Sequence, residues 1–525
     1  MAQRHSTPIR GLTATKRSPM FQGRFGRLFR SLPPATFGRT DKENEDNLAK
    51  LGHAMSASFD PPTDGQDPEE SAIPALYTYL GQFIDHDITF DPASSLQAQD
   101  DPDALTDFRT PAFDLDNIYG RGPDDQPYMY NTDGKTFLLG KPINAGQTKV
   151  GATDLPRNGA NPARALIGDP RNDENTIVSQ LQGLFHRFHN RTVHDQPNTK
   201  FEHIQKLVRF HYQYVVLHDF LPRIVKAGVL DELKNEEGEF DRSKLKFFHW
   251  KNEPFMPVEF SVACYRLGHS MIRPGYRLND DDKTLLPIFM TEDAKKLGFK
   301  DDLQGFREVD DNKAIDWGRF IDIDTRVYDG SKDENKKRLQ FAYRIDTSVV
   351  NPLEHLPAAV AANPSSLAER NLLRGWRLGL PSGQRVAAAM GVKPLDDSEI
   401  LIGKGVDKPD KEEDPFSIAE VGDVFKQNCP LWTYILAEAM HKPQEMLEIP
   451  VKEKKSITTP QLGQVGGRIV AEVFLGLLFG DNHSVLNLEP TWKPSKKVNG
   501  ELVPIPDYKL KDFVNYALGS ETPRT

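Results

Sequence analysis

The sequence predicts a mainly α-helical protein with long irregular loops and little sheet. Apolar residues recur at helical spacing in several long segments, most clearly in 176–195, where Ile177, Leu181 and Leu184 form a stripe. Between 90 and 175 the chain is rich in Pro, Gly, Asp and Asn and has little helical periodicity. Such a long irregular region in a compact protein usually forms binding loops. Strand-like alternation is short and weak throughout.

The composition describes an ordinary soluble globular protein. The chain has 525 residues, of which 38% are hydrophobic and 27% charged, and its length permits one large helical domain. A net charge of −10 argues against a dedicated nucleic-acid binder. Two cysteines cannot build a disulfide framework and fit reduced, buried thiols.

We divide the chain into a basic N-terminal arm, 1–45, and one large domain, 46–525. The first 40 residues carry eight Lys or Arg and no acid, with aromatic side chains such as Phe21 and Phe25. We expect this arm to be partly ordered and to dock by its aromatics; an arm that binds a partner or a membrane is the alternative.

No secretory leader or membrane span is expected. The N-terminus lacks an apolar core region, and the best apolar run, 469–479, contains Glu472 and is too short to cross a bilayer. We expect a soluble protein, either cytoplasmic or exported without a recognisable signal. The oligomeric state stays open.

Helices are predicted where apolar residues follow the helical period. Loops rich in Pro, Gly or charge separate them, as at 60–71, 234–240 and 404–414. The predicted helices are 73–88, 176–195, 201–227, 257–273, 415–447 and 460–480.

The first of these helices ends in an unusually polar group. Gln82 and His86 are four residues apart and share a face, while Asp85 and Asp87 flank the histidine. A packing helix has no use for so many polar groups, because each buried one must find a partner. The cluster fits a lined pocket, although a lone His on an apolar helix is more often a satisfied core or surface residue.

Three later segments also carry polar residues that packing does not explain. A turn, 168–174, places Arg171 at the start of the 176–195 helix. An apolar segment, 260–270, has His269 next to Gly268, and a glycine there would let a flat ligand approach closely. In 368–375, Asn371 and Arg374 fall on one helical face.

Together these segments resemble the animal-type haem peroxidases of the peroxidase–cyclooxygenase superfamily. They occur in the order of that family and cover roughly residues 70–480. The matching elements are Gly81-Gln82…Asp85-His86-Asp87, Gly168-Asp169-Pro170-Arg171, Arg266-Leu267-Gly268-His269 and Asn371…Arg374…Gly379-Leu380-Pro381. The resemblance implies a single large helical haem peroxidase fold, with 46–525 as the catalytic domain.

The resemblance implies haem b as cofactor, with His269 as the proximal iron ligand. Asn371 would accept a hydrogen bond from the other ring nitrogen of His269, which fixes the tautomer. Arg374 and Arg266 would pair with the haem propionates.

On the distal side, the resemblance implies that His86 is the general base for H2O2. Arg171 would stabilise negative charge as the O–O bond breaks, and Gln82 would bind distal water near a halide site.

Two carboxylates match the positions that form ester bonds to haem methyl groups in mammalian members, Asp85 and Glu174. We therefore expect at least partial covalent attachment of haem. In the mammalian enzyme with a sulfonium link, Met directly follows that Glu; here the residue is Asn175. We expect no sulfonium bond, which puts chloride oxidation in doubt.

The segment 110–116 places oxygen donors at every second position, which suits a hard cation. The resemblance implies a structural Ca2+ held by the set Thr110, Ala112 (through its backbone), Asp114, Asp116 and Asp87. An Asp-rich solvated loop is the alternative interpretation.

The sequence thus predicts a haem peroxidase that reduces H2O2 through an oxoferryl intermediate and oxidises small phenolic donors, halide or thiocyanate. A haem fatty-acid oxygenase is disfavoured, because cyclooxygenases use a Tyr three residues before the proximal His and Arg266 stands there. A catalytically inactive adhesion or scaffold homologue is the other alternative. His186, His189 and His194 share one predicted helix and are interpreted as structural.

Overall fold

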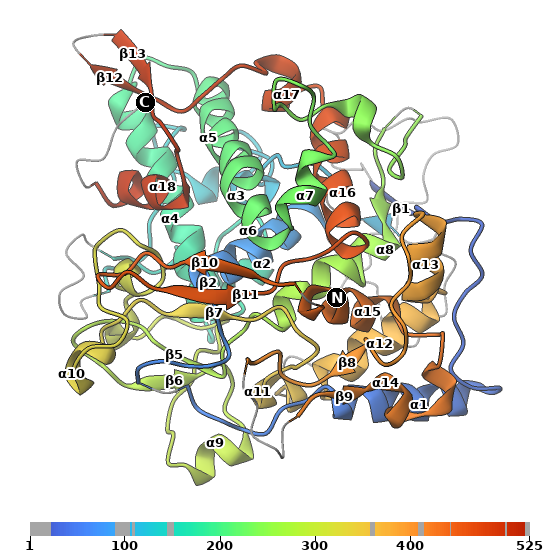
Figure 1. The fold of residues 1–525 in the computed structure, drawn as a ribbon. Coiled ribbons are helices and arrows are strands. Elements are labelled where there is room, and N and C mark those ends of the chain that lie inside the picture. Colours follow the sequence, from blue (N-terminus) through green and yellow to red (C-terminus); the bar gives the residue numbers. More distant parts are fainter. Residues whose placement is uncertain are drawn as a thin grey trace.

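The computed structural model describes most of the chain and is mainly helical (Figure 1). The described residues are 23–62, 64–89, 106–107, 111–143, 152–251, 253–357, 363–407, 414–441, 443–498 and 501–519. Within this part of the chain, no helix combines the length and the hydropathy that crossing a membrane requires.

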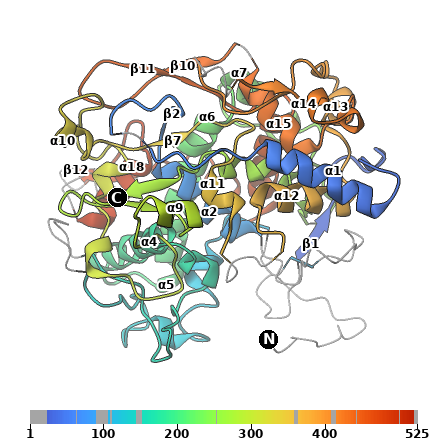
Figure 2. The same ribbon diagram turned by 90° about the horizontal axis from the view of Figure 1, so that it is seen from below.

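Helix α2 (Leu76–Ile88) stands near the middle of the molecule in two perpendicular views (Figures 1 and 2). It packs against α4 (Thr176–Asp195), where Phe83 stacks on Phe185 with ring centroids 4.4 Å apart. It also packs against a 3-10 helix, Cys264–His269. The polar end of α2 is therefore enclosed by segments distant in sequence.

Further long helices surround this centre. Helix α4 also packs on α5 and α18, and α12 packs on α1 and α15. Their bounds are α1 (Asp41–Ala54), α5 (Phe201–Val215), α12 (Leu367–Arg377), α15 (Leu431–Met440), α16 (Gly466–Gly480) and α18 (Leu510–Leu518).

The remaining helices are short. They are α3 (Asp116–Tyr119), α6 (Leu221–Ile224), α7 (Ala227–Asp231), α8 (Val258–Ser261), α9 (Glu292–Lys296), α10 (Lys332–Asn335), α11 (Asn351–Glu354), α13 (Gly383–Ala389), α14 (Ile418–Val421) and α17 (Val485–Leu488).

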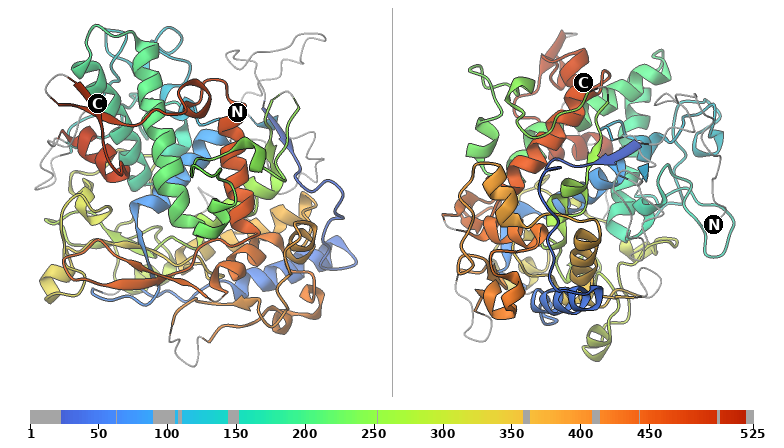
Figure 3. Two further views of the ribbon diagram at one scale, coloured as in Figure 1. Left: turned by 45° about the horizontal axis from the view of Figure 1, so that its top comes forward. Right: turned by 90° about the vertical axis from the view of Figure 1, so that its right-hand side faces the viewer.

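The described strands form small sheets of two or three strands, in the orders β3-β1-β4, β2-β7, β5-β6, β8-β9, β10-β11 and β12-β13. The β10–β11 hairpin, in orange, lies along one side of the molecule (Figure 3). The bounds are β1 (Gly23–Gly26), β2 (Glu70–Pro74), β3 (Thr106–Asp107), β4 (Met256–Pro257), β5 (Gly275–Arg277), β6 (Leu285–Pro287), β7 (Phe341–Tyr343), β8 (Leu401–Ile402), β9 (Phe416–Ser417), β10 (Glu445–Glu448), β11 (Ser456–Thr459), β12 (Ser495–Val498) and β13 (Glu501–Pro504).

Several helices differ from the sequence prediction in length. Residues 73–88 begin as strand β2, and 201–227 contains a π-helical turn, Val216–Phe220, before ending at Ile224. The predicted 257–273 helix is two short turns, because the Ser261 carbonyl accepts from Nε of Arg266 (2.9 Å). Within 415–447 only α14 and α15 are α-helices, and α16 begins at Gly466.

The described end of the N-terminal arm packs into the body. Strand β1 pairs with β4, and the side chains of Phe25 and Phe29 are buried in the core. The backbone N–H groups of Leu28 and Phe29 each donate to the buried Glu259 carboxylate over 3.1 Å. The rest of the arm, including Phe21, lies outside the described residues.

Candidate active site

Helix α2 presents its polar end to the interior of the protein. His86 and Asp87 are buried, and Gln82 and Asp85 are half-buried. Because α2 also carries a run of buried apolar residues, including Phe83 and Ile84, packing fixes its rotation and hence the direction of these polar groups.

His86 contacts the turn that precedes α4. Its Nδ1 lies 2.7 Å from Oδ1 of Asn172, and its Nε2 lies 3.7 Å from Oε1 of Glu174. Burial and the nearby Arg171 guanidinium lower the pKa of His86 to about 4. The imidazole is therefore neutral at physiological pH, as a proton acceptor must be.

Arg171 is anchored between that turn and the end of α2. Its guanidinium forms a 2.8 Å ion pair with the buried Asp169. It also donates to the backbone carbonyls of His86 (3.0 Å) and Thr89 (2.5 Å). These contacts place a permanent positive charge beside the His86 backbone.

Glu174 and Gln82 form a hydrogen-bonded pair in the same region. The Gln82 amide donates to Glu174 and accepts from Nδ2 of Asn175 (3.2 Å), which itself caps α4. The Glu174 side chain is 34% exposed, and burial raises its pKa to about 7. The side chain thus remains reachable although the protein surrounds it.

His269 lies at the end of the Cys264–His269 3-10 helix. Nδ2 of the Asn371 side chain, from α12, lies 2.8 Å from Nδ1 of His269. Burial and the charge of Arg266 lower the pKa of His269 to about 3. The predicted role of Asn371 as acceptor requires the opposite amide orientation, with Oδ1 at this contact. In that orientation His269 carries its proton on Nδ1 and can offer Nε2 to a metal.

Contacts between α2 and the Cys264–His269 segment bring the two histidine regions together. The Tyr265 hydroxyl donates to the Gly81 carbonyl over 3.2 Å, and NH1 of Arg266 lies 3.7 Å from Oδ2 of Asp85. Trp432 of α15 in turn donates to the Arg266 carbonyl over 3.2 Å.

The residues fit a flat, charged ligand such as haem. Apart from the chain neighbours of Gly268, no atom of the described residues lies within 4 Å of a Cβ placed on it, so space is open beside His269. Two half-buried cations are close in sequence to His269 and Asn371: Arg266 precedes His269 by three residues, and Arg374 follows Asn371 by three on α12. Guanidinium groups of this kind pair with the carboxylates of an acidic ligand. These features fit His269 as an axial ligand of a planar, anionic group such as haem.

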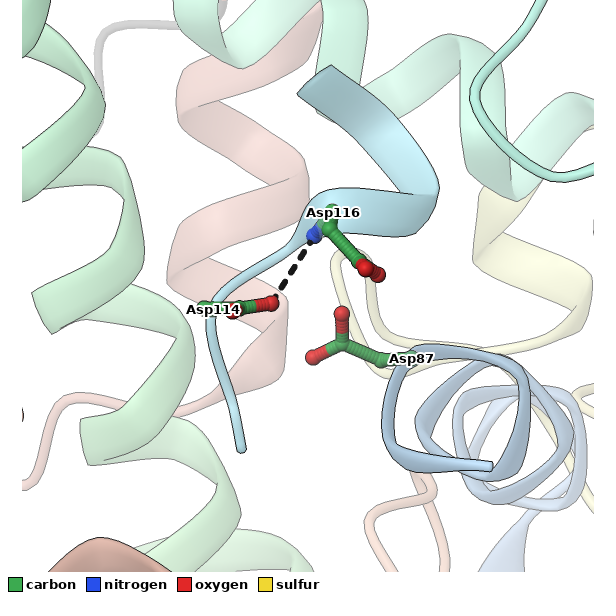
Figure 4. Close-up of side chains that lie close together, drawn as sticks. All are labelled: Asp87, Asp114 and Asp116. Carbon is green, nitrogen blue, oxygen red and sulfur yellow. Dashed lines mark hydrogen bonds between the residues drawn. The ribbon is translucent and has the colours of Figure 1, made fainter. Parts of the chain in front are cut away.

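A second cluster consists of three carboxylates on α2 and the 111–116 segment (Figure 4). One oxygen from each of Asp87, Asp114 and Asp116 lies within 4.8 Å of the others. Burial and Asp116 raise the pKa of Asp114 to about 8. Such clustering of negative charge is costly without a cation. Of the other predicted ligands, Ala112 is buried and Thr110 lies outside the described residues.

Some functional contacts were missed by sequence reasoning. Asn172 and Asn175 were not assigned roles, yet they bond to His86 and Gln82. Gln182 and His186, four apart on α4, continue the contacts of Asn172 into the core. Two polar residues at this spacing within an apolar stripe were the available signal.

Part of the chain is similar in sequence to known haem peroxidases. Residues 96–305 match the family model for animal haem peroxidase. Thyroid peroxidase from Rattus norvegicus is 25% identical over 231 residues, covering 40% of this chain and 24% of the relative. Thyroid peroxidase from Sus scrofa is 26% identical over 194 residues, which cover 33% of this chain and 20% of that relative. The matched region thus spans about a quarter of these relatives or less.

Among solved structures, peroxidase A from Dictyostelium discoideum shares the fold. Its TM-score is 0.53 at 15% sequence identity, with 90% of each chain covered. Over residues 96–305 the chain is therefore similar in sequence to animal haem peroxidases, and it shares its fold with a solved peroxidase structure. The family match includes His269 and ends before Asn371.

Proposed function

We propose that this protein is a haem peroxidase that reduces H2O2 to water and oxidises small phenolic donors, halide or thiocyanate. One observation carries the proposal: the buried His86 and the half-buried His269 each have a side-chain amide at Nδ1. The Tyr265–Gly81 hydrogen bond joins the segments that bear them. One histidine for iron and one for peroxide is the arrangement that peroxidase chemistry requires.

On the proximal side, His269 would hold the haem iron through Nε2, and Asn371 would fix the ring. Arg266 and Arg374 would pair with the propionates. Asp85 of α2 and Glu174, which contacts Gln82 and His86 of that helix, are proposed to form ester bonds to ring methyl groups. Each bond would replace a methyl C–H with C–O, a two-electron oxidation in which H2O2 is the oxidant and is reduced to water. Haem, when bound, supplies the redox centre that accepts oxidising equivalents from peroxide.

On the distal side, Nε2 of His86 would take a proton from H2O2 and return it to the departing oxygen. Arg171 would stabilise the negative charge that develops as the O–O bond breaks. Gln82, whose amide is already bonded to Glu174 and Asn175, would orient water or halide beside them.

A structural Ca2+ is proposed at the three-carboxylate cluster, with Asp87, Asp114 and Asp116 as side-chain ligands. Their mutual proximity supports this, since a divalent cation would offset the repulsion between them. Thr110 and the Ala112 carbonyl would complete the coordination.

The visible spectrum of the purified protein, recorded before and after H2O2, tests the function. A ferric Soret band that shifts with peroxide, followed by turnover of guaiacol or iodide, is expected. A colourless protein that takes up no haem would instead support the scaffold alternative. A haem-bearing protein that does not oxidise guaiacol or iodide with H2O2, but consumes O2 in the presence of a fatty acid, would support the oxygenase alternative.

A further inference from the structure

A line of buried polar side chains leads away from His86 into the core. Nδ1 of His86 lies 2.7 Å from Oδ1 of Asn172. Nδ2 of Asn172 donates to Oε1 of Gln182 over 2.7 Å, and Nε2 of Gln182 lies 3.0 Å from Nε2 of His186. The line joins α2, the turn before α4, and α4 itself.

These residues are polar where an apolar core is the simpler solution. Asn172 and Gln182 are 0% exposed and His186 is 1% exposed. Burying an amide costs free energy unless each of its groups is paired, and an aliphatic side chain would avoid that cost. The His186 ring stacks on Phe137 at 4.4 Å, and its Nδ1 has no hydrogen-bond partner among the described residues. Among the described residues, the line therefore ends at His186.

The turn that carries Asn172 is held from several sides. Asp169 caps it by accepting from the Arg171 N–H (2.8 Å). Arg157 bonds both carboxylate oxygens of Asp173 at 2.7 Å. The position of the Asn172 amide is thus fixed independently of His86.

A side-chain amide accepts hydrogen bonds at its oxygen and donates them at its nitrogen. Its orientation therefore fixes the direction of the hydrogen bonds on both of its sides. With Oδ1 of Asn172 facing His86, the proton of that imidazole is on Nδ1, which leaves a lone pair on Nε2. Reversing the ring tautomer requires both amides to turn over. The tautomers of His86 and His186 are thereby coupled.

We propose that Asn172, Gln182 and His186 are positioning residues that hold His86 with its proton on Nδ1 and its lone pair on Nε2. The inference rests on the proposed function, in which Nε2 of His86 accepts the peroxide proton. The opposite tautomer presents an N–H at that atom and cannot accept.

Neutron diffraction from deuterium-exchanged crystals of the purified protein tests the polarity directly. Deuterium is expected on Nδ1 of His86 and on Nδ1 of His186. The deuterated amide nitrogens, Nδ2 of Asn172 and Nε2 of Gln182, are expected on the side of each amide that faces away from His86. Deuterium on Nε2 of a neutral His86, or reversed amides, would overturn the proposal. This readout does not depend on activity, so it stands even if the peroxidase assignment fails.

Stopped-flow kinetics with H2O2 test the consequence. Asn172→Ala should slow the peroxide step about 10- to 100-fold, by analogy with the loss of a partner that orients a metal-binding imidazole. Asn172→Asp should recover most of the rate, because a carboxylate still accepts from Nδ1–H. Gln182→Leu should give a smaller loss, since Asn172 then loses its orienting partner.

A matched control separates positioning from structure. Gln180, a buried amide on the same helix, bonds Lys313 and Ile315 instead. Gln180→Leu should lower stability and leave the rate constant unchanged. In a His86→Ala background, Asn172→Ala should have no further effect on the rate. An Asn172→Ala loss that persists in that background, or that Gln180→Leu reproduces, would refute the positioning role.

Discussion

Tyr265 donates a hydrogen bond of 3.2 Å to the Gly81 carbonyl, tying the segment that ends in His269 to the helix that carries His86. The Arg266–Asp85 contact of 3.7 Å reinforces the same junction. The two halves of the proposed site are therefore held by contacts between the segments themselves. Five predictions follow from this geometry and its surroundings.

Replacing His86 with Ala should slow the reaction with H2O2 about 100- to 10,000-fold, because the variant loses the group that moves the peroxide proton. Stopped-flow observation of the Soret band measures the rate. His203→Ala, at an exposed position on α5, should react like the wild type. Near-normal rates in the His86 variant would contradict the assignment.

Gly268→Leu should abolish or weaken haem uptake while leaving the fold intact. The new side chain would enter open space beside His269 rather than the packed core. Absorbance per mole of protein, with circular dichroism for the fold, measures both effects. Gly228 on α7 also faces open space and is exposed, so Gly228→Leu should bind haem normally. Equal haem content in the two variants would place haem elsewhere.

Asp85→Asn and Glu174→Gln should each reduce the fraction of haem that resists acid–acetone extraction. Together they should make all of it extractable, because an amide cannot form the ester. Glu308→Gln, at the surface, serves as the control. Fully extractable haem in the wild type would show that no ester forms.

Chelation should lower the melting temperature, and Ca2+ should restore it. Without the cation, the carboxylates of Asp87, Asp114 and Asp116 repel one another. Asp87→Asn should lose this response, whereas Asp125→Asn, at an exposed position, should keep it. If metal analysis finds no Ca2+ and the chelator does not change the melting temperature, the proposed Ca2+ site is excluded.

Asp346 should make the protein less stable as pH rises. Its buried carboxylate accepts from the backbone N–H groups of Ser348 (2.9 Å) and Gly405 (2.7 Å), yet burial raises its pKa from 3.8 to about 7. The native state therefore binds this proton more tightly than the unfolded state. Its contribution to stability is fully present below about pH 4 and is lost as pH rises through about 7.

Comparison of the wild type with Asp346→Asn isolates that group. Each unit of pKa difference corresponds to about 1.4 kcal/mol. The difference in unfolding free energy between the two proteins should change between pH 4 and pH 7 and stay constant above about pH 8. Denaturant titrations at several pH values measure it, and a pH-independent difference would show that Asp346 has an ordinary pKa.

Helical periodicity determined the class of fold and several helices. Helix α4 spans the predicted 176–195. Its long apolar stripe favours a helix over this length, and the Asn175 side chain caps its N-terminus. Periodicity failed where tertiary contacts redirect the chain. The 260–270 segment has helical periodicity. In the structure the Arg266 side chain donates to the Ser261 carbonyl, and Cys264–His269 forms a 3-10 helix.

The sequence by itself determined which residue types meet in the candidate site, since Gln82, His86, Arg171 and His269 stand in short, ordered motifs. Only the tertiary structure decided how they are held. The partners of His86 and His269 are Asn172 and Asn371, which come from separate elements of the chain. Local spacing fixes the face on which a side chain lies, whereas long-range packing fixes what that side chain touches and which of its atoms remains available for chemistry.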